Sequence, residues 1–259
     1  MNFVQDIIHI VETYGMSFLR GAGFTMLIAM IGTIVGFFIG LGAAIVRTIP
    51  VTKHTKTPVR ILIKTAQGIV TAYVEIFRGT PMMVQAMILH FGIFTHLFSF
   101  DNSLKILSSL AIISINTGAY MAEIVRGGII SVDPGQTEGA HSIGMTHWQT
   151  MTSVILPQAI RNIMPSIGNE FVVNIKDSSV LNVIGLSELF FNGKSAAGQT
   201  FKYYQTFLVV AAIYLVLTFT VTRILKLLEK KMDGNGNYTV FGSQSSSEGE
   251  IHISKEESV

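Results

Sequence analysis

The residues best suited to chemistry are polar side chains that recur within one apolar segment, residues 162–187. Glu170, Asn174 and Asp177 stand four and three residues apart, so an α-helix places them on one face, with Ser178 close by. Two carboxylates and an amide on one face suit a ligand that carries an ammonium group and a second cationic group. We therefore predict that this face binds substrate.

Each carboxylate also has a structural interpretation, in which a basic side chain of the protein neutralises it. Arg78, Arg126 and Lys176 are the candidates for this role. Lys176 is rotated by about 100° from Asp177 on a helix and so does not share its face. The sequence leaves both interpretations open.

A second candidate is the segment around Pro81, where a helix would be interrupted. Proline has no amide hydrogen and Gly79 loosens the turn before it, so main-chain groups lose their intrahelical partners. Thr80 offers a hydroxyl at this point, and Gln85 lies four residues beyond Pro81 on the same helix face. The segment could receive a ligand carboxylate, or it could be a kink that neighbouring helices satisfy.

A third candidate is the polar segment 133–157, which separates two apolar stretches. Pro134 and Gly135 predict a turn, and residues 136–143 can form a short helix. Gly144 then permits a change of direction that a residue with a Cβ would resist.

A second short helix should begin at Thr146, because Gln149 three residues later completes a capping box. We expect Pro157 to end its regular hydrogen-bond ladder. Trp148 belongs to a strongly apolar side of this helix, which needs either a partner protein or the rest of the chain to cover it.

These residues are positioned by a very apolar chain. Of its 259 residues, 49% are hydrophobic and 13% are charged, whereas about a quarter are charged in an ordinary soluble domain. Five segments are apolar enough to be membrane spans, namely residues 21–46, 79–100, 106–122, 162–187 and 203–222. The sequence therefore predicts an all-α, polytopic membrane protein. Inside a membrane, main-chain groups without a hydrogen-bond partner and ionised side chains are tolerated only where they are buried within the protein or line a water-filled cavity.

Orientation follows from the basic residues, which stay on the cytoplasmic side of a span. Residues 1–19 contain no Lys or Arg, whereas the loop after the first span is rich in both. This places the N-terminus outside and, after five crossings, the C-terminus inside. Residues 1–232 form the predicted transmembrane domain, and residues 233–259, rich in Gly, Ser, Asn and Glu, are predicted to be a disordered cytoplasmic tail.

Several kinds of function lack the residues they would need. The chain has no cysteine, and its seven histidines form no metal-ligand pair. Gly193-Lys194-Ser195 imitates the end of a phosphate-binding loop, but Glu188 stands where that loop needs a glycine. We therefore expect neither an enzyme nor a bound cofactor or metal, and the net charge of +2 gives no support for nucleic acid.

The polar segment resembles the coupling (EAA) motif of the permease subunits of ATP-binding cassette (ABC) importers. The matching positions are Glu138, Ala140, Gly144, Leu156 and Pro157, with Gly139 in place of the second alanine. Four stretches, at residues 75–81, 118–129, 156–159 and 176–179, resemble the polar amino acid branch of that family, the histidine, glutamine and arginine type.

The resemblance implies a type I importer permease of a bacterial cell membrane that works as a homodimer or with a sister subunit. Its coupling segment, Trp148 included, would sit on a separate ATPase subunit, which binds the ATP and Mg²⁺. An extracytoplasmic binding protein would deliver a polar amino acid, cationic or glutamine. Thr80, Pro81, Glu170 and Asp177 would then line the central cavity.

A secondary transporter driven by an ion gradient is the alternative. In that case Glu170 or Asp177 would bind a proton or sodium ion. Such transporters usually contain paired internal repeats, which this sequence does not show, and they need no coupling segment.

Overall fold

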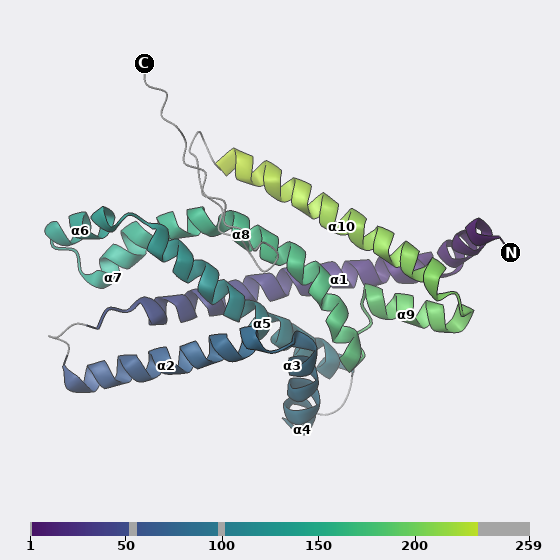
Figure 1. Cartoon of the computed structure of the whole chain (residues 1–259), viewed down its shortest axis with the longest axis horizontal. Helices are drawn as coiled ribbons and strands as arrows, with labels where there is room; N and C mark the ends of the chain where they lie inside the picture. Colours follow the sequence, from purple (N-terminus) through teal and green to yellow (C-terminus); the bar gives the residue numbers. More distant parts are fainter. Residues whose placement is uncertain (1, 52–55, 98–101, 233–259) are drawn as a thin grey trace, which may run out of the picture.

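The computed structural model describes residues 2–51, 56–97 and 102–232, and every regular element in this part of the chain is a helix (Figure 1). The elements in order are α1 (Phe3–Thr48), α2 (Thr57–Gly79), α3 (Met82–Leu89), η1 (His90–Phe94), α4 (Thr95–Leu97), α5 (Asn102–Ser131), α6 (Pro134–Ser142), α7 (His147–Thr150), η2 (Met151–Ile155), α8 (Leu156–Asp177), η3 (Ser178–Ile184), α9 (Leu189–Thr200) and α10 (Tyr203–Met232). η1 and η2 are π-helical turns and η3 is a 3₁₀-helix. The predicted tail, residues 233–259, lies outside the described residues.

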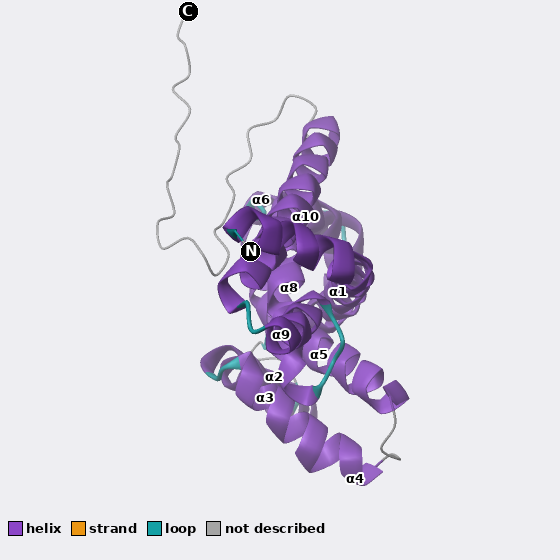
Figure 2. Ribbon diagram, turned by 90° about the vertical axis from the view of Figure 1, so that its right-hand side faces the viewer, coloured by secondary structure: helices purple, strands orange, loops and turns teal. Residues whose placement is uncertain are grey.

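α1 is the axis around which the other long helices are arranged (Figure 1). It extends well before the expected span that begins at residue 21, and its first turns pack beside α9 and α10. Ile10 and Phe18 contribute to a buried cluster with Leu189 and Val210, and Asp6 forms an ion pair with Lys202. In the view turned by 90°, the loops that the structure describes are short (Figure 2).

A row of glycines fixes the contact between α1 and α5. A Cβ added at Gly32 would lie 2.6 Å from the Ile113 side chain, and one at Gly40 would lie 2.7 Å from the backbone nitrogen of Ala122. Gly36 meets α5 in the same way. Small residues four apart therefore allow the two backbones to approach closely, as they do between membrane helices.

Three helices, α1, α5 and α10, are long and apolar enough to cross a membrane, and they contain three of the five expected spans. The other two are interrupted. Residues 79–100 yield a shorter apolar run, Met82–Leu97, which follows the break at Pro81. Residues 162–187 form α8 only as far as Asp177 and continue as η3, because polar and small residues around Ser178 favour a tighter turn.

Pro157 does not end the second short helix, contrary to the sequence prediction. α7, η2 and α8 follow one another directly, and Pro157 lies in the first turn of α8. The hydrogen-bond ladder is already irregular where η2 passes into α8, so a proline, which has no amide hydrogen, is accommodated there. The π-helical turn Met151–Ile155 precedes it and widens the hydrogen-bond ladder at that point.

Candidate functional site

A polar cavity of about 380 Å³ lies at the break between α2 and α3. Its lining includes Gly79, Thr80 and Pro81 from the break and Asp177 from the end of α8. These four residues were predicted from the sequence as parts of one substrate site, and they are almost 100 positions apart in the chain. The fold brings them to the same cavity.

The break between α2 and α3 is satisfied by side chains of the protein. Gln85 is buried, and its Nε2 donates to the Phe77 carbonyl at 2.9 Å and to the carbonyl and hydroxyl of Thr80, both at 2.8 Å. Asn116 Nδ2 in turn donates to Gln85 Oε1 at 2.8 Å. Gln85 therefore holds the interrupted backbone in place, whereas Thr80 and the backbone beside it remain exposed to the cavity.

The polar stripe of α8 divides into a buried part and a cavity part. Asn174 is buried and joins three helices, since its Nδ2 donates to Thr33 Oγ1 on α1 at 2.8 Å and its Oδ1 accepts from Thr117 Oγ1 on α5 at 2.9 Å. Ser178 is also buried and donates to the Ile175 carbonyl. Asp177 is half-buried and reaches the cavity.

Glu170 is 2% exposed and lies two turns before Asp177 on the same helix. One of the structural partners considered for it is engaged elsewhere, because Arg126 forms an ion pair with Glu123, as does Arg47. Lys176 is exposed.

Arg78 lines the cavity, although from the sequence it was considered only as a possible partner of Glu170 or Asp177. Its guanidinium carbon lies 5.5 Å from the centroid of the Tyr120 ring, within range of a cation–π interaction. It lines the cavity together with Asp177 and Thr80. Its position directly before Gly79 was the available signal, since Gly79 is the last residue of α2 and Arg78 therefore lies beside the break.

The cavity thus presents opposite charges beside a hydroxyl group and exposed backbone. A guanidinium can bind a carboxylate through two parallel hydrogen bonds, and a carboxylate can accept from an ammonium group. This arrangement suits a zwitterion. Among the described residues, no group of three or more His, Asp and Glu side chains could hold a metal ion.

The segment 133–157 forms a helical hairpin at one end of the molecule (Figure 1). Asp133 caps α6 through a hydrogen bond from the Gly135 amide, and Gly144 turns the chain with φ of +83°. Thr146 and Gln149 form the expected capping box at the start of α7. The turn at Gly144 and the cap at Thr146 therefore follow the sequence prediction. The predicted turn at Pro134 and Gly135 was wrong, because both residues belong to the first turn of α6, whose cap at Asp133 was not predicted.

The two faces of this hairpin differ in exposure. Met151 and Ile155 pack with Val132 and Ala159 in a buried cluster. Trp148 is 64% exposed and Ile143 is 78% exposed, so part of the apolar surface is covered by the chain itself and part is open.

The predicted coupling residues are distributed accordingly. Glu138, Gly139, Gly144, Trp148 and Pro157 are exposed, Leu156 is half-buried and Ala140 is buried. Outside the membrane spans, burial and the nearby His141 lower the pKa of His147, so this imidazole is neutral at pH 7.

A long-helix membrane protein with an open polar cavity and an exposed helical hairpin has the features of a transporter's membrane subunit. The family model for the inner membrane component of binding-protein-dependent transport systems matches residues 63–234. The chain belongs to this family, which confirms the resemblance drawn from its motifs, and it is a protein of the inner membrane.

Three similar proteins extend the comparison. The glutamine transport system permease protein GlnP of Escherichia coli strain K12 is 33% identical over 219 residues, covering 83% of this chain and 92% of that protein. The arginine transport system permease protein ArtQ of Bacillus subtilis strain 168 is 31% identical over 217 residues, covering 84% and 93%. A chain from the crystal structure of an amino acid ABC transporter with histidines superposes with a TM-score of 0.74 at 32% identity, covering 89% of this chain and 99% of that one. These relatives are membrane components rather than enzymes.

Proposed function

We propose that the chain is the permease subunit of an ATP-driven amino acid importer and that the cavity at the α2–α3 break binds the substrate. One observation carries the proposal: Arg78, Thr80 and Asp177, from distant parts of the chain, line one polar cavity. Glutamine and arginine transport permeases among the relatives support an amino acid as the cargo.

Each group of the substrate has a partner in this cavity. Arg78 receives the α-carboxylate and Asp177 receives the α-ammonium group, while Thr80, whose hydroxyl donates to the Ile76 carbonyl, forms part of the wall between them. Glu170, buried deeper on the same helix face, favours a side chain that carries a second cationic group or an amide. The substrate class is therefore a polar L-amino acid, cationic (arginine, lysine or histidine) or glutamine.

The exposed hairpin is the contact with a separate ATPase subunit in this proposal. Its turn is fixed by Gly144 and its open face carries Trp148 and Glu138. ATP and Mg²⁺ bind to the ATPase, whose closure moves the hairpin, while a binding protein delivers the amino acid from outside. The chain crosses the membrane five times and pairs with a second permease subunit, with its N-terminus outside.

The assembled complex, purified and reconstituted, tests both parts of the proposal. We expect ATP hydrolysis to be stimulated by one class of polar amino acid in a panel covering cationic, neutral and acidic side chains. Uptake should stop without ATP and continue when ionophores collapse the ion gradients. The opposite pattern would identify a secondary transporter.

Arg78→Lys tests the cavity within that complex. It keeps the charge but loses the planar pair of donors, so the amino acid concentration for half-maximal stimulation should rise about tenfold, equivalent to about 1.4 kcal/mol. Arg223→Lys is the matched control. Arg223 also lies over an aromatic ring, that of Phe219, but it does not line the cavity. Equal effects of the two changes would remove Arg78 from the site.

A further inference from the structure

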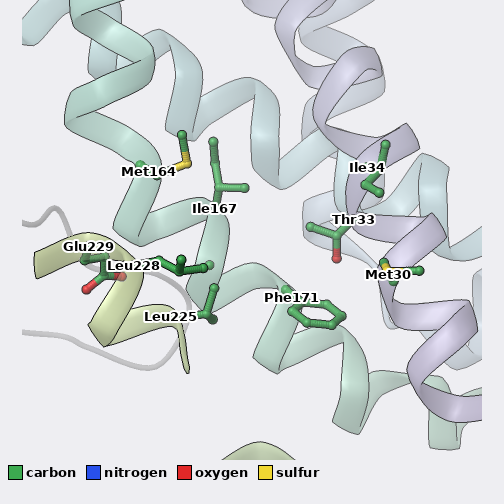
Figure 3. Close-up of a pocket in the computed structure, with 10 residues that line it drawn as sticks. Met30, Thr33, Ile34, Met164, Ile167, Phe171, Leu225, Leu228 and Glu229 are labelled. Atoms are coloured by element: carbon green, nitrogen blue, oxygen red, sulfur yellow. The ribbon is translucent and has the colours of Figure 1, made fainter. Parts of the chain in front are cut away.

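A second cavity, of about 250 Å³, opens between α1, α8 and α10 (Figure 3). Its walls are Met30, Thr33 and Ile34 from α1, Met164, Ile167, Gly168 and Phe171 from α8, and Leu225, Leu228 and Glu229 from α10. It shares no lining residue with the polar cavity at the α2–α3 break. We call it the α10 groove.

At the floor of the α10 groove, the polar side chain is already hydrogen-bonded within the protein. Thr33 is the polar residue there, and its hydroxyl donates to the Ala29 carbonyl at 2.7 Å and accepts from Asn174 Nδ2 at 2.8 Å. Its methyl group is what remains for a ligand. With Met30, Ile34, Ile167 and Phe171 around it, the groove suits a hydrocarbon chain.

The groove lies where α10 changes from an apolar span to a basic end. Residues 203–222 are free of charge, and Arg223, Lys226 and Lys230 follow. Leu228, which lines the groove, is 52% exposed, and Ile34 on the opposite wall is also 52% exposed. The groove is therefore open, and its α10 wall lies where an apolar span gives way to basic residues, a pattern typical of the boundary between bilayer hydrocarbon and lipid head groups.

At the mouth of the groove Glu229 lines the α10 wall, and the exposed Lys226, which is not itself a lining residue, lies one turn before it. Lys226 and Glu229 are three residues apart on α10 and so are neighbours on its surface. Among residues with described side chains, the ion pairs join Glu123 to Arg47 and Arg126, and Asp6 to Lys202. Both charges at the mouth are thus available to a ligand.

We propose that the α10 groove binds one acyl chain of a phospholipid whose head group carries a primary ammonium beside its phosphate. Lys226 contacts the phosphate and Glu229 accepts a hydrogen bond from the ammonium group. A head group without an ammonium would leave the Glu229 carboxylate without a cationic partner beside the phosphate, with Lys226 alone to offset the repulsion. The inference does not depend on which solute the protein transports.

Tryptophan fluorescence in vesicles tests this inference on the reconstituted complex. Leu228→Trp places a reporter in the groove, and Leu227→Trp, one position along on the exposed outer face, is its matched control. Both variants keep the chain's single native tryptophan as the same background. Ile34→Trp provides a second reporter from α1, in case the α10 variant does not fold.

Phospholipids with brominated acyl chains quench a tryptophan that they contact. We expect Leu228→Trp to reach half-maximal quenching at an about fivefold lower mole fraction of brominated phosphatidylethanolamine, whose head group has an ammonium, than of brominated phosphatidylglycerol, whose head group has none. Leu227→Trp should show the same curve for both lipids. Adding Glu229→Gln to Leu228→Trp should abolish the preference while quenching remains.

Two outcomes would overturn the proposal. Identical curves for both lipids at Leu228→Trp and Ile34→Trp would show that no head group is recognised. If neither lipid quenched Leu228→Trp or Ile34→Trp while both still quenched Leu227→Trp, the groove would be covered by protein, such as a second copy of this chain.

Discussion

The turn at Gly144 allows a backbone effect to be separated from a packing effect. Gly144 has φ of +83°, and a Cβ built there meets no atom within 4 Å. Gly144→Ala therefore causes no clash, but an L side chain in this left-handed region costs about 1–2 kcal/mol. That energy corresponds to about a five- to thirtyfold loss in the population of the native turn.

Gly139→Ala is the matched control, because it is the same chemical change in the same hairpin. A Cβ at Gly139 also meets no atom within 4 Å, but this residue lies within helix α6 and has no left-handed conformation. Alanine is favoured over glycine inside a helix by about 0.5–1 kcal/mol. The two substitutions should therefore change the stability of the hairpin in opposite directions.

Hydrogen exchange of the amides in α6 and α7 measures this effect without any partner. We expect exchange to speed up about five- to thirtyfold in Gly144→Ala and to slow slightly in Gly139→Ala. In the assembled complex, Gly144→Ala should also weaken binding to the ATPase and reduce substrate-stimulated hydrolysis. The same exchange rates and the same hydrolysis in both variants would refute the role assigned to the turn.

Three further changes have equally direct expectations. Gln85→Leu removes the donor to the Phe77 and Thr80 carbonyls and leaves the buried Asn116 amide without its acceptor, so it should destabilise the protein by about 1–3 kcal/mol in a denaturation experiment; an unchanged midpoint would mean that another group replaces the amide. Gly40→Ala would place a Cβ 2.4 Å from the Met121 Cβ and should cost about 1–3 kcal/mol, whereas Gly42→Ala, with no atom within 4 Å, should be tolerated; equal melting temperatures would contradict the close α1–α5 contact. Glu170→Gln should impair uptake of cationic amino acids more than that of neutral ones, and equal losses would make Glu170 structural.

The sequence predicted those features that depend on local rules. The capping box at Thr146, the turn at Gly144 and the break before Pro81 each follow from a few neighbouring residues. The apolar length of α1 and α10 follows from composition alone. Each of these is a property of a short segment that other parts of the chain do not change.

The prediction was wrong where two local signals compete. A proline such as Pro157 is compatible with the end of one helix and with the start of the next. In the structure it follows a π-helical turn and lies in the first turn of α8. The interrupted helix from residue 162 was likewise missed, since its apolar composition resembles that of an unbroken span and the change at Ser178 depends on its surroundings.

By itself, the sequence determined that this is a helical membrane protein with a polar, capped segment between its spans and with polar residues inside apolar helices, because composition, periodicity and caps are encoded locally. Only the tertiary structure decided how those polar residues divide. It turned Gln85 and Asn174 inward to satisfy other elements and left Asp177 beside Arg78 and Thr80 in a cavity. The physical reason is that a buried polar group must find its hydrogen-bond partners in space, and those partners come from helices far apart in the chain.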